Sequence, residues 1–200
     1  MDIDELIINL YKHGCILIGD FKLSSGKWSP YYIDLRRVPS YPSLFNDVAD
    51  IYVENIRSMD YNFYGIVGIA TAGIPLATLI AYKLNKPLIY VRKESKTHGT
   101  KRDVEGIFDK NSRLLIIDDV ITTGSSIYNA ILKIRKYGGI VDRGVVLIDR
   151  EQNGIKFLRE NGIYVNAIIK TSYLFKVLLE NKCISCKEYK KIVKYISDIS

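Results

Sequence analysis

Short aliphatic runs alternate with amphipathic stretches along the chain. Such runs are typical of strands buried on both faces of a sheet, and they occupy residues 65–70, 87–92, 114–117, 144–148 and 164–169. Apolar positions spaced as on one helix face lie over residues 73–84, 125–137 and 155–161. The alternation predicts an α/β fold in which a central parallel sheet is flanked by helices.

The region before the first core strand has a different pattern. A helix is predicted from Asp2 or Asp4 to near Gly14, with Asp2 and Glu5 at the spacing of a capping-box variant. Residues 21–36 are dense in aromatic, glycine and polar residues and are not predicted to form sheet core. We expect one domain over residues 1–200, with the N-terminal helix and aromatic segment in about residues 1–42 and the core in about residues 65–170.

The third aliphatic run stops at Asp118 and Asp119, and hydroxyl residues around Gly124 follow. Ligands of open parallel sheets bind beyond the carboxyl ends of such strands. There, the amides that open the next helix favour a phosphate, and the carboxylates can accept hydrogen bonds from sugar hydroxyls or hold Mg²⁺ through water. The pattern predicts a site for a phosphorylated ribose; the alternative is a strand, a turn and a capped helix without a ligand. A Walker A loop is excluded because Gly-x-x-x-x-Gly-Lys-Ser/Thr is missing here.

Composition narrows the class of protein. A chain of 200 residues with 48% hydrophobic content can bury a substantial core without disulfides. No apolar stretch approaches the length of a membrane span, and the acidic start is unlike a secretion signal, so we expect a cytoplasmic protein. Cys183 and Cys186 have the spacing of a redox or zinc half-site, but only Cys15, His13 and His98 are available as further soft ligands, which favours incidental thiols.

The formal net charge of +7 fits a nucleic-acid binder, a polyanionic small substrate or a lysine-rich surface. Lysines over residues 182–194 have the helical spacing of a solvated face. A second basic cluster directly follows a predicted strand and has no apolar period; it contains Arg92, Lys93, Lys96, His98, Lys101 and Arg102. This cluster indicates a basic loop beside a strand end.

Two further features suit a planar, anionic ligand. Tyr31 and Tyr32 lie in the aromatic segment, where flat rings can stack on a base. The alternative is a packed hairpin in which both tyrosines only cover neighbouring side chains. Arg150 follows the run at residues 144–148 and is therefore expected at the same sheet edge as Asp118. Its guanidinium group is either a surface cation or the partner of a carboxylate, which it can bind through two parallel hydrogen bonds.

Four segments together resemble the orotate phosphoribosyltransferases of the type I phosphoribosyltransferase family. Residues 114–126 resemble the motif that binds phosphoribosyl diphosphate (PRPP), and residues 92–99, Arg-Lys-Glu-Ser-Lys-Thr-His-Gly, resemble the catalytic loop. Residues 21–36 are similar to the N-terminal base-binding hood, and Arg150 matches the orotate-binding arginine. The resemblance implies the type I fold and transfer of the 5-phosphoribosyl group from PRPP to orotate. The products would be orotidine 5'-monophosphate and pyrophosphate, in pyrimidine (UMP) biosynthesis.

The resemblance also implies a role for each matching residue. The catalytic residues would be Arg92, Lys93, Lys96 and His98. These four would also bind PRPP, together with Asp118, Asp119, Val120, Ile121, Thr122, Thr123, Gly124, Ser125 and Ser126. Orotate would be bound by Thr122, Arg150, Tyr31 and Tyr32. The implied cofactor is Mg²⁺, held mainly through PRPP and through water to the two aspartates, with no direct protein ligand.

The same resemblance implies a homodimer in which Lys93 reaches the neighbouring subunit's site, and neither nucleic acid nor a membrane is expected as a partner. The chain departs from many bacterial relatives in two places. It has Leu-Ser-Ser-Gly at residues 23–26 in place of Leu-Lys-Ser-Gly, with Lys22 or Lys27 as candidate substitutes. It also has Ala-Thr-Ala-Gly at residues 70–73 in place of a loop with a Tyr-Lys pair, so backbone amides and Thr71 must do more of the binding.

Two rival functions are weaker interpretations of the sequence. A purine or uracil phosphoribosyltransferase would share residues 118–126 but would lack Arg150 and the basic loop. A regulator that senses PRPP and binds nucleic acid would need an added DNA-binding module, and none is recognisable in these 200 residues.

Overall fold

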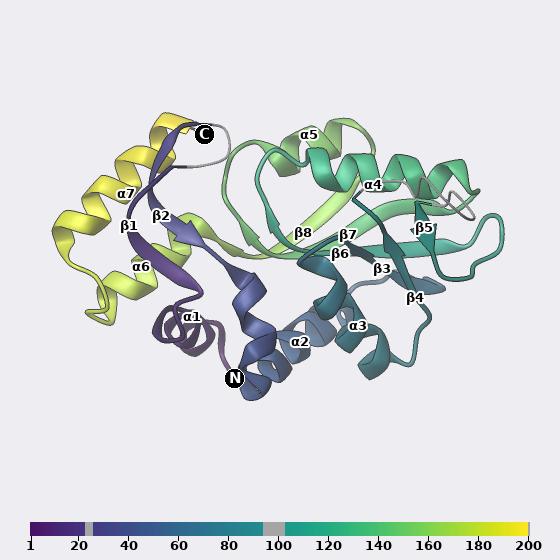
Figure 1. The fold of residues 1–200 in the computed structure, drawn as a ribbon, viewed down its shortest axis with the longest axis horizontal. Helices are drawn as coiled ribbons and strands as arrows, with labels where there is room; N and C mark the ends of the chain where they lie inside the picture. Colours follow the sequence, from purple (N-terminus) through teal and green to yellow (C-terminus); the bar gives the residue numbers. More distant parts are fainter. Residues whose placement is uncertain (23–25, 94–102, 200) are drawn as a thin grey trace.

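The strands of the chain form two sheets (Figure 1). The computed structural model describes residues 1–22, 26–93 and 103–199. The larger sheet has six strands in the order β5-β4-β3-β6-β7-β8, and the smaller sheet pairs β1 with β2. The smaller sheet contains β1 (Ile16–Lys22) and β2 (Trp28–Ile33). The larger one contains β3 (Gly65–Ile69), β4 (Leu88–Val91), β5 (Val104–Glu105), β6 (Arg113–Ile121), β7 (Ile140–Asp149) and β8 (Tyr164–Lys170).

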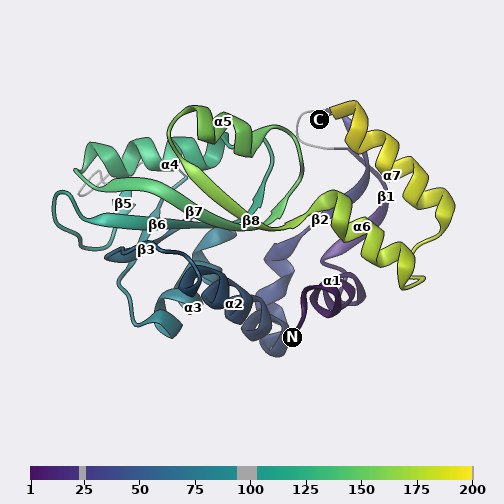
Figure 2. The same ribbon diagram turned by 180° about the vertical axis from the view of Figure 1, so that it is seen from behind.

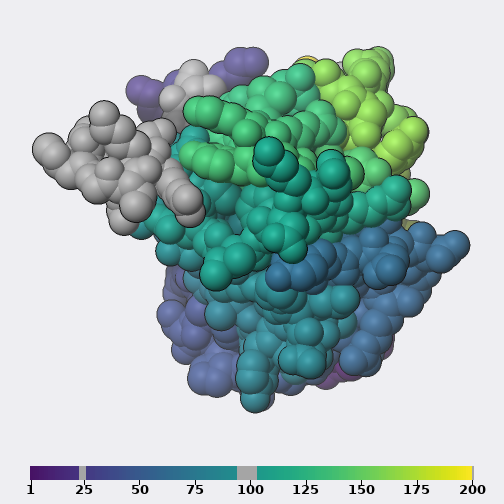
Figure 3. Space-filling view, turned by 90° about the vertical axis from the view of Figure 1, so that its right-hand side faces the viewer, coloured from purple at the N-terminus to yellow at the C-terminus, as the bar shows by residue number. Residues whose placement is uncertain are grey.

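Helices cover both faces of the larger sheet (Figures 1 and 2). One face carries α2 (Pro42–Arg57) and α3 (Gly73–Leu84), and the other carries α4 (Ser125–Lys136) and α5 (Gly154–Glu160). Figure 3 shows these layers from the end that carries β5, with the green residues of α4 above the blue residues of α2 and α3. The hairpin of β1 and β2 is surrounded by α1 (Ile3–Lys12), α6 (Thr171–Glu180) and α7 (Cys186–Ile199), and the 3-10 helix η1 (Leu35–Ser40) connects it to α2.

The predicted α/β architecture is confirmed, with one exception in strand direction. All neighbours in the larger sheet are parallel except β4 and β5, which are antiparallel. In β6, Leu115 and Ile117 join the core beneath α2 and α3, whereas Leu114 and Ile116 join the core beneath α4. Burial on both faces explains why this strand is a continuous aliphatic run in the sequence.

The order of the strands creates a crevice between β3 and β6. The chain leaves β3 for β4 on one side and returns to form β6 on the other side, so connections diverge at this point. Pairing of β6 with β3 ends at Ile117, but pairing with β7 continues to Ile121. The prediction that this strand stops at Ile117 was therefore wrong, because Asp118, Val120 and Ile121 still pair with β7 while the β3 side of the strand faces the crevice.

Residues 21–36 lie outside the core sheet, as predicted, but part of this segment forms the antiparallel hairpin. The strand β1 was not predicted from the sequence. Its aliphatic residues are few, and its register shifts between Ile18 and Phe21, which breaks the alternation that identifies a strand. Of the two interpretations of this segment, a packed hairpin is the one that the structure shows.

The helices at the two ends of the chain agree with the sequence pattern. The amide of Glu5 donates to the Asp2 side chain at 2.7 Å, which is the predicted N-cap of α1. The lysines of α7 lie on an exposed face, whereas Ile192 and Ile196 are buried. None of the described helices is long and apolar enough to cross a membrane.

Two helices, α2 and α6, were not predicted. In α2 the signals are present: Pro42 at the first position and buried residues such as Leu44, Val48 and Ile51 at helical spacing. In contrast, α6 begins at Thr171 directly after β8 ends at Lys170, so no turn residue marks the boundary. Because no residue signals this boundary, the helix was not recognised from the sequence.

Candidate active site

The loop after β6, residues 122–126, has the geometry of an anion site. Gly124 has φ +79° and is the N-cap of α4, where no side chain caps the helix. The backbone N–H groups of the first turn therefore have no side-chain acceptor among the described residues, and the helix dipole is directed at the same point. The Thr123 and Ser125 hydroxyls lie 3.0 Å apart beside them. We call residues 122–126 the phosphate loop because this arrangement suits a phosphate group.

The start of α5 supports the phosphate loop from behind. A Cβ atom on Gly154 would overlap the carbonyl oxygen of Thr122 and would lie 2.9 Å from the nitrogen of Gly124. A Cβ atom on Gly124 would in turn lie 2.9 Å from the Gly154 carbonyl oxygen. The two glycines therefore allow backbone-to-backbone contact between the loop and α5. Gly154 was not identified from the sequence, where it is simply a glycine shortly after Arg150.

The acidic pair lies immediately before this loop. Asp118 is buried, and burial and the neighbouring Asp119 raise its pKa well above the usual range. Burial also raises the pKa of Asp119, although its hydrogen bond from the Val120 amide, at 2.9 Å, opposes the shift. The Tyr52 hydroxyl donates to the Asp118 carbonyl oxygen at 2.7 Å and holds this part of β6 against α2. The strand thus presents two carboxylates in a fixed and poorly solvated position.

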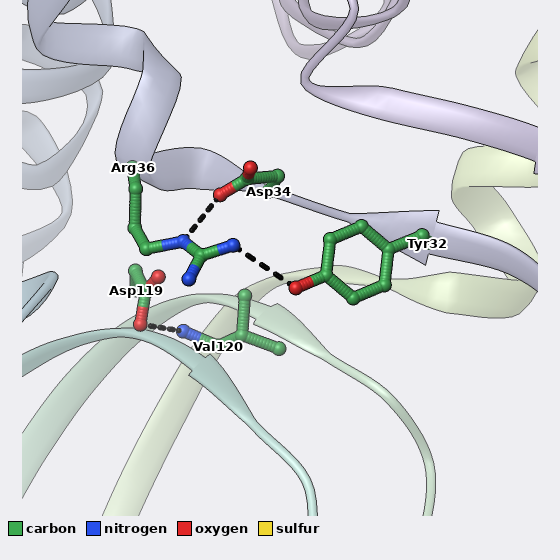
Figure 4. Close-up of polar contacts among 5 residues, drawn as sticks. All are labelled: Tyr32, Asp34, Arg36, Asp119 and Val120. Carbon is green, nitrogen blue, oxygen red and sulfur yellow. Dashed lines mark hydrogen bonds and ion pairs between the residues drawn. The ribbon is translucent and has the colours of Figure 1, made fainter. Parts of the chain in front are cut away.

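Arg36 in η1 is a cation beside the acidic pair that sequence reasoning did not assign to the site (Figure 4). Its Nε lies 2.5 Å from Asp34 Oδ1, and its Nη2 donates to the Tyr32 hydroxyl at 3.0 Å. Its positive charge also lowers the pKa of Asp119, although less than burial raises it. The guanidinium group is bonded to Asp34 and Tyr32 on the hairpin side of the site, and Asp119 lies beside it.

The crevice wall opposite the acidic pair is the start of α3. A Cβ atom on Gly73 would lie 2.9 Å from Asp118 Oδ1, so a larger residue would push against this carboxylate. The Ala70–Thr71 peptide in the preceding loop is cis, and Thr71 is exposed. The loop at residues 70–73, one of the two departures in the sequence, therefore lies against the predicted ribose site.

A basic pocket of about 180 Å³ lies between the ends of β3 and β4 and the helix α4. Its lining includes Arg92, Lys93, Ser126, Asn129 and Lys133, and none of the described residues that line it is acidic. The ammonium group of Lys133 donates to the Arg92 carbonyl oxygen at 2.8 Å and to the Lys93 carbonyl oxygen at 3.5 Å. Lys133 was not identified from the sequence, because the apolar spacing of its helix is simply that of a helix packed on a sheet.

Arg92 is also held by its side chain. Its Nε lies 2.9 Å from Glu105 Oε1, an ion pair between the end of β4 and β5. The other two predicted catalytic residues, Lys96 and His98, lie outside the described residues, as do Lys101 and Arg102. The structure therefore places the first half of the predicted basic loop beside the phosphate loop.

Arg150 follows β7 and is half-buried, with part of its guanidinium group shielded from solvent. Its backbone N–H donates to the Ile121 carbonyl oxygen at 2.9 Å, which ties it to the end of β6. Its Nε and Nη2 atoms are buried and have no hydrogen-bond partner among the described residues. The guanidinium carbon lies 5.0 Å from the centre of the Tyr31 ring. Buried polar groups are normally hydrogen-bonded, so these two nitrogens are available as donors to an acceptor such as an anion.

The two tyrosines of the hairpin differ in exposure. Tyr31 is fully buried, so no face of its ring is open to a base in this structure, and it contacts Arg150 instead. Tyr32 is half-buried, with its ring 5.7 Å from that of Phe21 and its hydroxyl bonded to Arg36. Lys22 and Lys27 are exposed, whereas residues 23–25 between them lie outside the described part.

The acidic pair fits a water-mediated contact to Mg²⁺ better than direct coordination. In residues 1–22, 26–93 and 103–199, no group of three or more His, Cys, Asp or Glu side chains is arranged to hold a metal ion. Two adjacent carboxylates supply too few oxygens for a magnesium site made of protein alone. Phosphate oxygens and water would have to complete the coordination.

Comparison with known proteins identifies the family. Residues 38–157 match the model of the phosphoribosyl transferase domain. The orotate phosphoribosyltransferase of Staphylothermus marinus is 39% identical over 98% of this chain and 95% of that protein. The crystal structure of orotate phosphoribosyltransferase from Aeropyrum pernix has a TM-score of 0.78 and 35% identity, covering 90% of this chain and 99% of that one. A UMP synthase of Leishmania donovani reaches a TM-score of 0.89 at 34% identity, and 98% of this chain covers 42% of it. The chain therefore belongs to the phosphoribosyltransferase family and, within it, to the orotate phosphoribosyltransferases.

Proposed function

We propose that this chain transfers the 5-phosphoribosyl group from PRPP to orotate, giving orotidine 5'-monophosphate and pyrophosphate. The observation that carries the proposal is the guanidinium group of Arg150, whose buried Nε and Nη2 have no hydrogen-bond partner among the described residues and which lies at the same sheet edge as the phosphate loop. A phosphoribosyltransferase for a neutral base would have no use for this charge. An anionic base such as orotate offers a carboxylate that pairs with it.

The phosphate loop is the proposed site of the 5-phosphate of PRPP. The free amides at the start of α4 and the hydroxyls of residues 122–126 supply the donors. Asp118 and Asp119 accept hydrogen bonds from the ribose hydroxyls, which poor solvation strengthens. The basic pocket beside this loop, with Arg92, Lys93 and Lys133, is the proposed site of the pyrophosphate end.

Orotate is proposed to lie between the phosphate loop and the hairpin. Its carboxylate pairs with Arg150, and Thr122 bonds the polar edge of the base. Tyr32, whose hydroxyl accepts a hydrogen bond from Arg36, is proposed to lie on the hairpin side of the base. Tyr31 contributes by supporting Arg150 rather than by stacking on the base.

The chemistry requires charge stabilisation more than a strong base. When the bond between ribose C1 and pyrophosphate breaks, negative charge develops on the leaving group and positive charge on the sugar. Arg92 and Lys93, with Lys96 and His98 from the undescribed segment, are proposed to neutralise the leaving group. Mg²⁺ bound to the diphosphate supplies further positive charge there. Orotate is already anionic, so Thr122 and Arg150 mainly hold its nitrogen in line with the sugar.

Four finer predictions accompany this function. The enzyme is expected to depend on Mg²⁺ and to act as a homodimer in which Lys93 contributes to the neighbouring site. It is also expected in the cytoplasm, and without nucleic acid or a membrane as a partner. Chelation of the metal should abolish turnover, and sedimentation velocity should give the mass of two chains.

The test of the function is orotate consumption followed by ultraviolet absorbance, with PRPP and Mg²⁺. Uracil, adenine, hypoxanthine and xanthine are measured in parallel. Loss of orotate that needs both PRPP and Mg²⁺ is the expected result. Turnover of another base without loss of orotate would overturn the assignment of Arg150. Inactivity on every base, combined with salt-sensitive retention on DNA, would favour a regulator instead.

A further inference from the structure

The two C-terminal helices enclose the tyrosine that contacts Arg150. The Tyr31 ring centre lies 4.8 Å from that of Phe175 in α6 and 5.8 Å from that of Tyr195 in α7. The Tyr195 ring meets it edge-on, at an interplanar angle of 84°. With Arg150 over the same ring, these contacts leave Tyr31 fully buried. The position of the Tyr31 ring is therefore set by helices far along the chain.

Arg150 depends on that ring for its orientation. Its Nε and Nη2 make no hydrogen bond among the described residues, and Tyr31 is the side chain that it contacts, through its ring and through electrostatic interaction with its hydroxyl group. A side chain as long as arginine has many rotamers, and without a polar partner only packing selects one. If Tyr31 shifts, the guanidinium group loses the surface that holds it in place.

The helices are themselves tied to the strand that carries Arg150 and to the hairpin. The Thr171 hydroxyl, at the start of α6, donates to the Asp149 carbonyl oxygen at 2.7 Å, one residue before Arg150. Lys191 in α7 forms an ion pair with Asp20 in β1, and Ile192 and Ile196 are buried. The helix α7 therefore has a fixed position against the hairpin.

Given the function proposed above, we propose that Tyr195 is a positioning residue for orotate: its ring fixes Tyr31, which in turn holds Arg150 ready for the carboxylate of the base. Tyr195, Phe175 and Tyr31 all lie outside residues 38–157, which match the general phosphoribosyl transferase model. The phosphate loop lies inside that range. The C-terminal helices thus belong to recognition of the base rather than to handling of PRPP.

Tyr195 is a better site for a test than Phe175. Phe175 is fully buried, and its truncation would leave a cavity in the core. Tyr195 is half-buried and touches Tyr31 with its ring edge, so its loss removes one aromatic contact and spares the centre of the core. Tyr189 on the same helix is also half-buried but has no ring contact with Tyr31, and it provides a matched control.

The experiment compares Tyr195→Leu, Tyr195→Phe and Tyr189→Leu with the unmodified chain. The KM of orotate, the KM of PRPP and kcat are measured for each, together with the thermal unfolding midpoint. Tyr195→Leu is expected to raise the KM of orotate about three- to tenfold, the range of a lost aromatic pair, with the KM of PRPP within about twofold. Tyr195→Phe keeps the ring and should restore the KM of orotate. Tyr189→Leu should leave both values unchanged.

Several results would overturn the positioning role. Equal increases in both KM values for Tyr195→Leu would show a general loss of structure. The same orotate effect in Tyr189→Leu would show that the contact with Tyr31 is irrelevant. If Tyr195→Leu does not fold, Tyr195→Gln, which suits a half-buried position, repeats the test with the same expectations. An unmodified chain that consumes no orotate overturns the proposed function, whereas an active chain with an unchanged Tyr195→Leu variant overturns only the role of Tyr195.

Discussion

The two halves of the candidate site are assembled in opposite ways. The ribose-phosphate half is one continuous stretch, from Asp118 near the end of β6 to Ser126 in α4. The base half combines Arg150 after β7, Tyr31 in β2 and the helices α6 and α7. A continuous stretch is positioned by local backbone geometry, whereas a dispersed one exists only when distant elements have packed together.

Each half also contains an ionisable side chain with buried polar atoms, and the two side chains are of opposite sign. On the ribose side it is the carboxylate of Asp118, and on the base side it is the guanidinium group of Arg150. Each charge matches the ligand group proposed for it, hydroxyl donors of a sugar or the carboxylate of a base. If the two substrates are bound as proposed, separate groups of residues bind them, and a substitution in one half should affect one substrate more than the other.

The largest effect is expected from Arg150→Gln, which removes the charge of the base half. Loss of a buried charge pair should lower kcat/KM for orotate about 100-fold, while the KM of PRPP stays within about twofold. Steady-state kinetics with each substrate varied in turn measures both. Arg159→Gln removes an exposed arginine from α5 and is the matched control. An equal loss for both substrates in Arg150→Gln would contradict the separation of the halves.

A smaller effect is expected from Gly154→Ala, which disturbs the phosphate half. The added methyl group would overlap the Thr122 carbonyl oxygen and displace the phosphate loop. We expect the KM of PRPP to rise about tenfold, with a smaller change for orotate. Lys156→Ala, at an exposed position of the same helix, should behave as the unmodified chain does. A normal KM of PRPP in Gly154→Ala would show that the loop tolerates displacement.

Lys133→Met should weaken the phosphate half more mildly. It removes the hydrogen bonds from α4 to the carbonyl oxygens of Arg92 and Lys93. A loss of about 1 kcal/mol corresponds to a rise of about fivefold in the KM of PRPP. Lys133→Arg should recover part of the loss, and Lys136→Met, at the exposed end of α4, should have none. A larger change for orotate than for PRPP would place Lys133 in the other half.

The smallest expected effect is on stability: Asp118→Asn should raise the free energy of unfolding. Burial raises the pKa of Asp118 above its usual value of about 3.9, so the folded chain binds this proton more tightly than the unfolded chain. The free energy of unfolding of the unmodified chain therefore falls as pH rises above about 4. The amide introduced by Asp118→Asn does not titrate, so the variant should gain about 1 kcal/mol at neutral pH and nothing below the usual pKa.

Thermal unfolding between pH 4 and pH 8 measures this difference, with Asp109→Asn as the control at an exposed carboxylate. A midpoint difference that shrinks with rising pH would contradict the direction of the pKa shift. Loss of activity in the same Asp118→Asn protein would show that the buried charge serves binding at the expense of stability.

The difference between the halves also explains how much could be predicted from sequence. Five strands of the larger sheet and the position of the loop at residues 122–126 were predicted because aliphatic runs and the glycine at residue 124 are local signals, whereas the two-residue strand β5 was not predicted. The end of β6 was predicted four residues too early, at Ile117 instead of Ile121, because pairing with β7 continues past the point where β3 leaves. Arg150 was placed at the right edge, since strand direction fixes it.

Contacts between distant segments were beyond the reach of sequence patterns. No spacing rule connects Tyr31 with Phe175 and Tyr195, and an aromatic-rich segment is equally typical of a stacking surface and of a buried core. The positions of Lys133 and Arg36 in the site could not be predicted for the same reason, because their hydrogen-bond partners lie on other elements. The structure identifies them only through the fold that brings those elements together.

The enclosure of the hairpin by α6 and α7 has a consequence for the order in which the chain acquires its parts during synthesis. The phosphate loop and the strands on either side of it are complete once β7 has formed. The hairpin leaves the ribosome much earlier, yet Tyr31 remains uncovered until the segment with Phe175 and Tyr195 has been made. A nascent chain would thus acquire its phosphate site first, and its base pocket would be completed only when α6 and α7 had emerged.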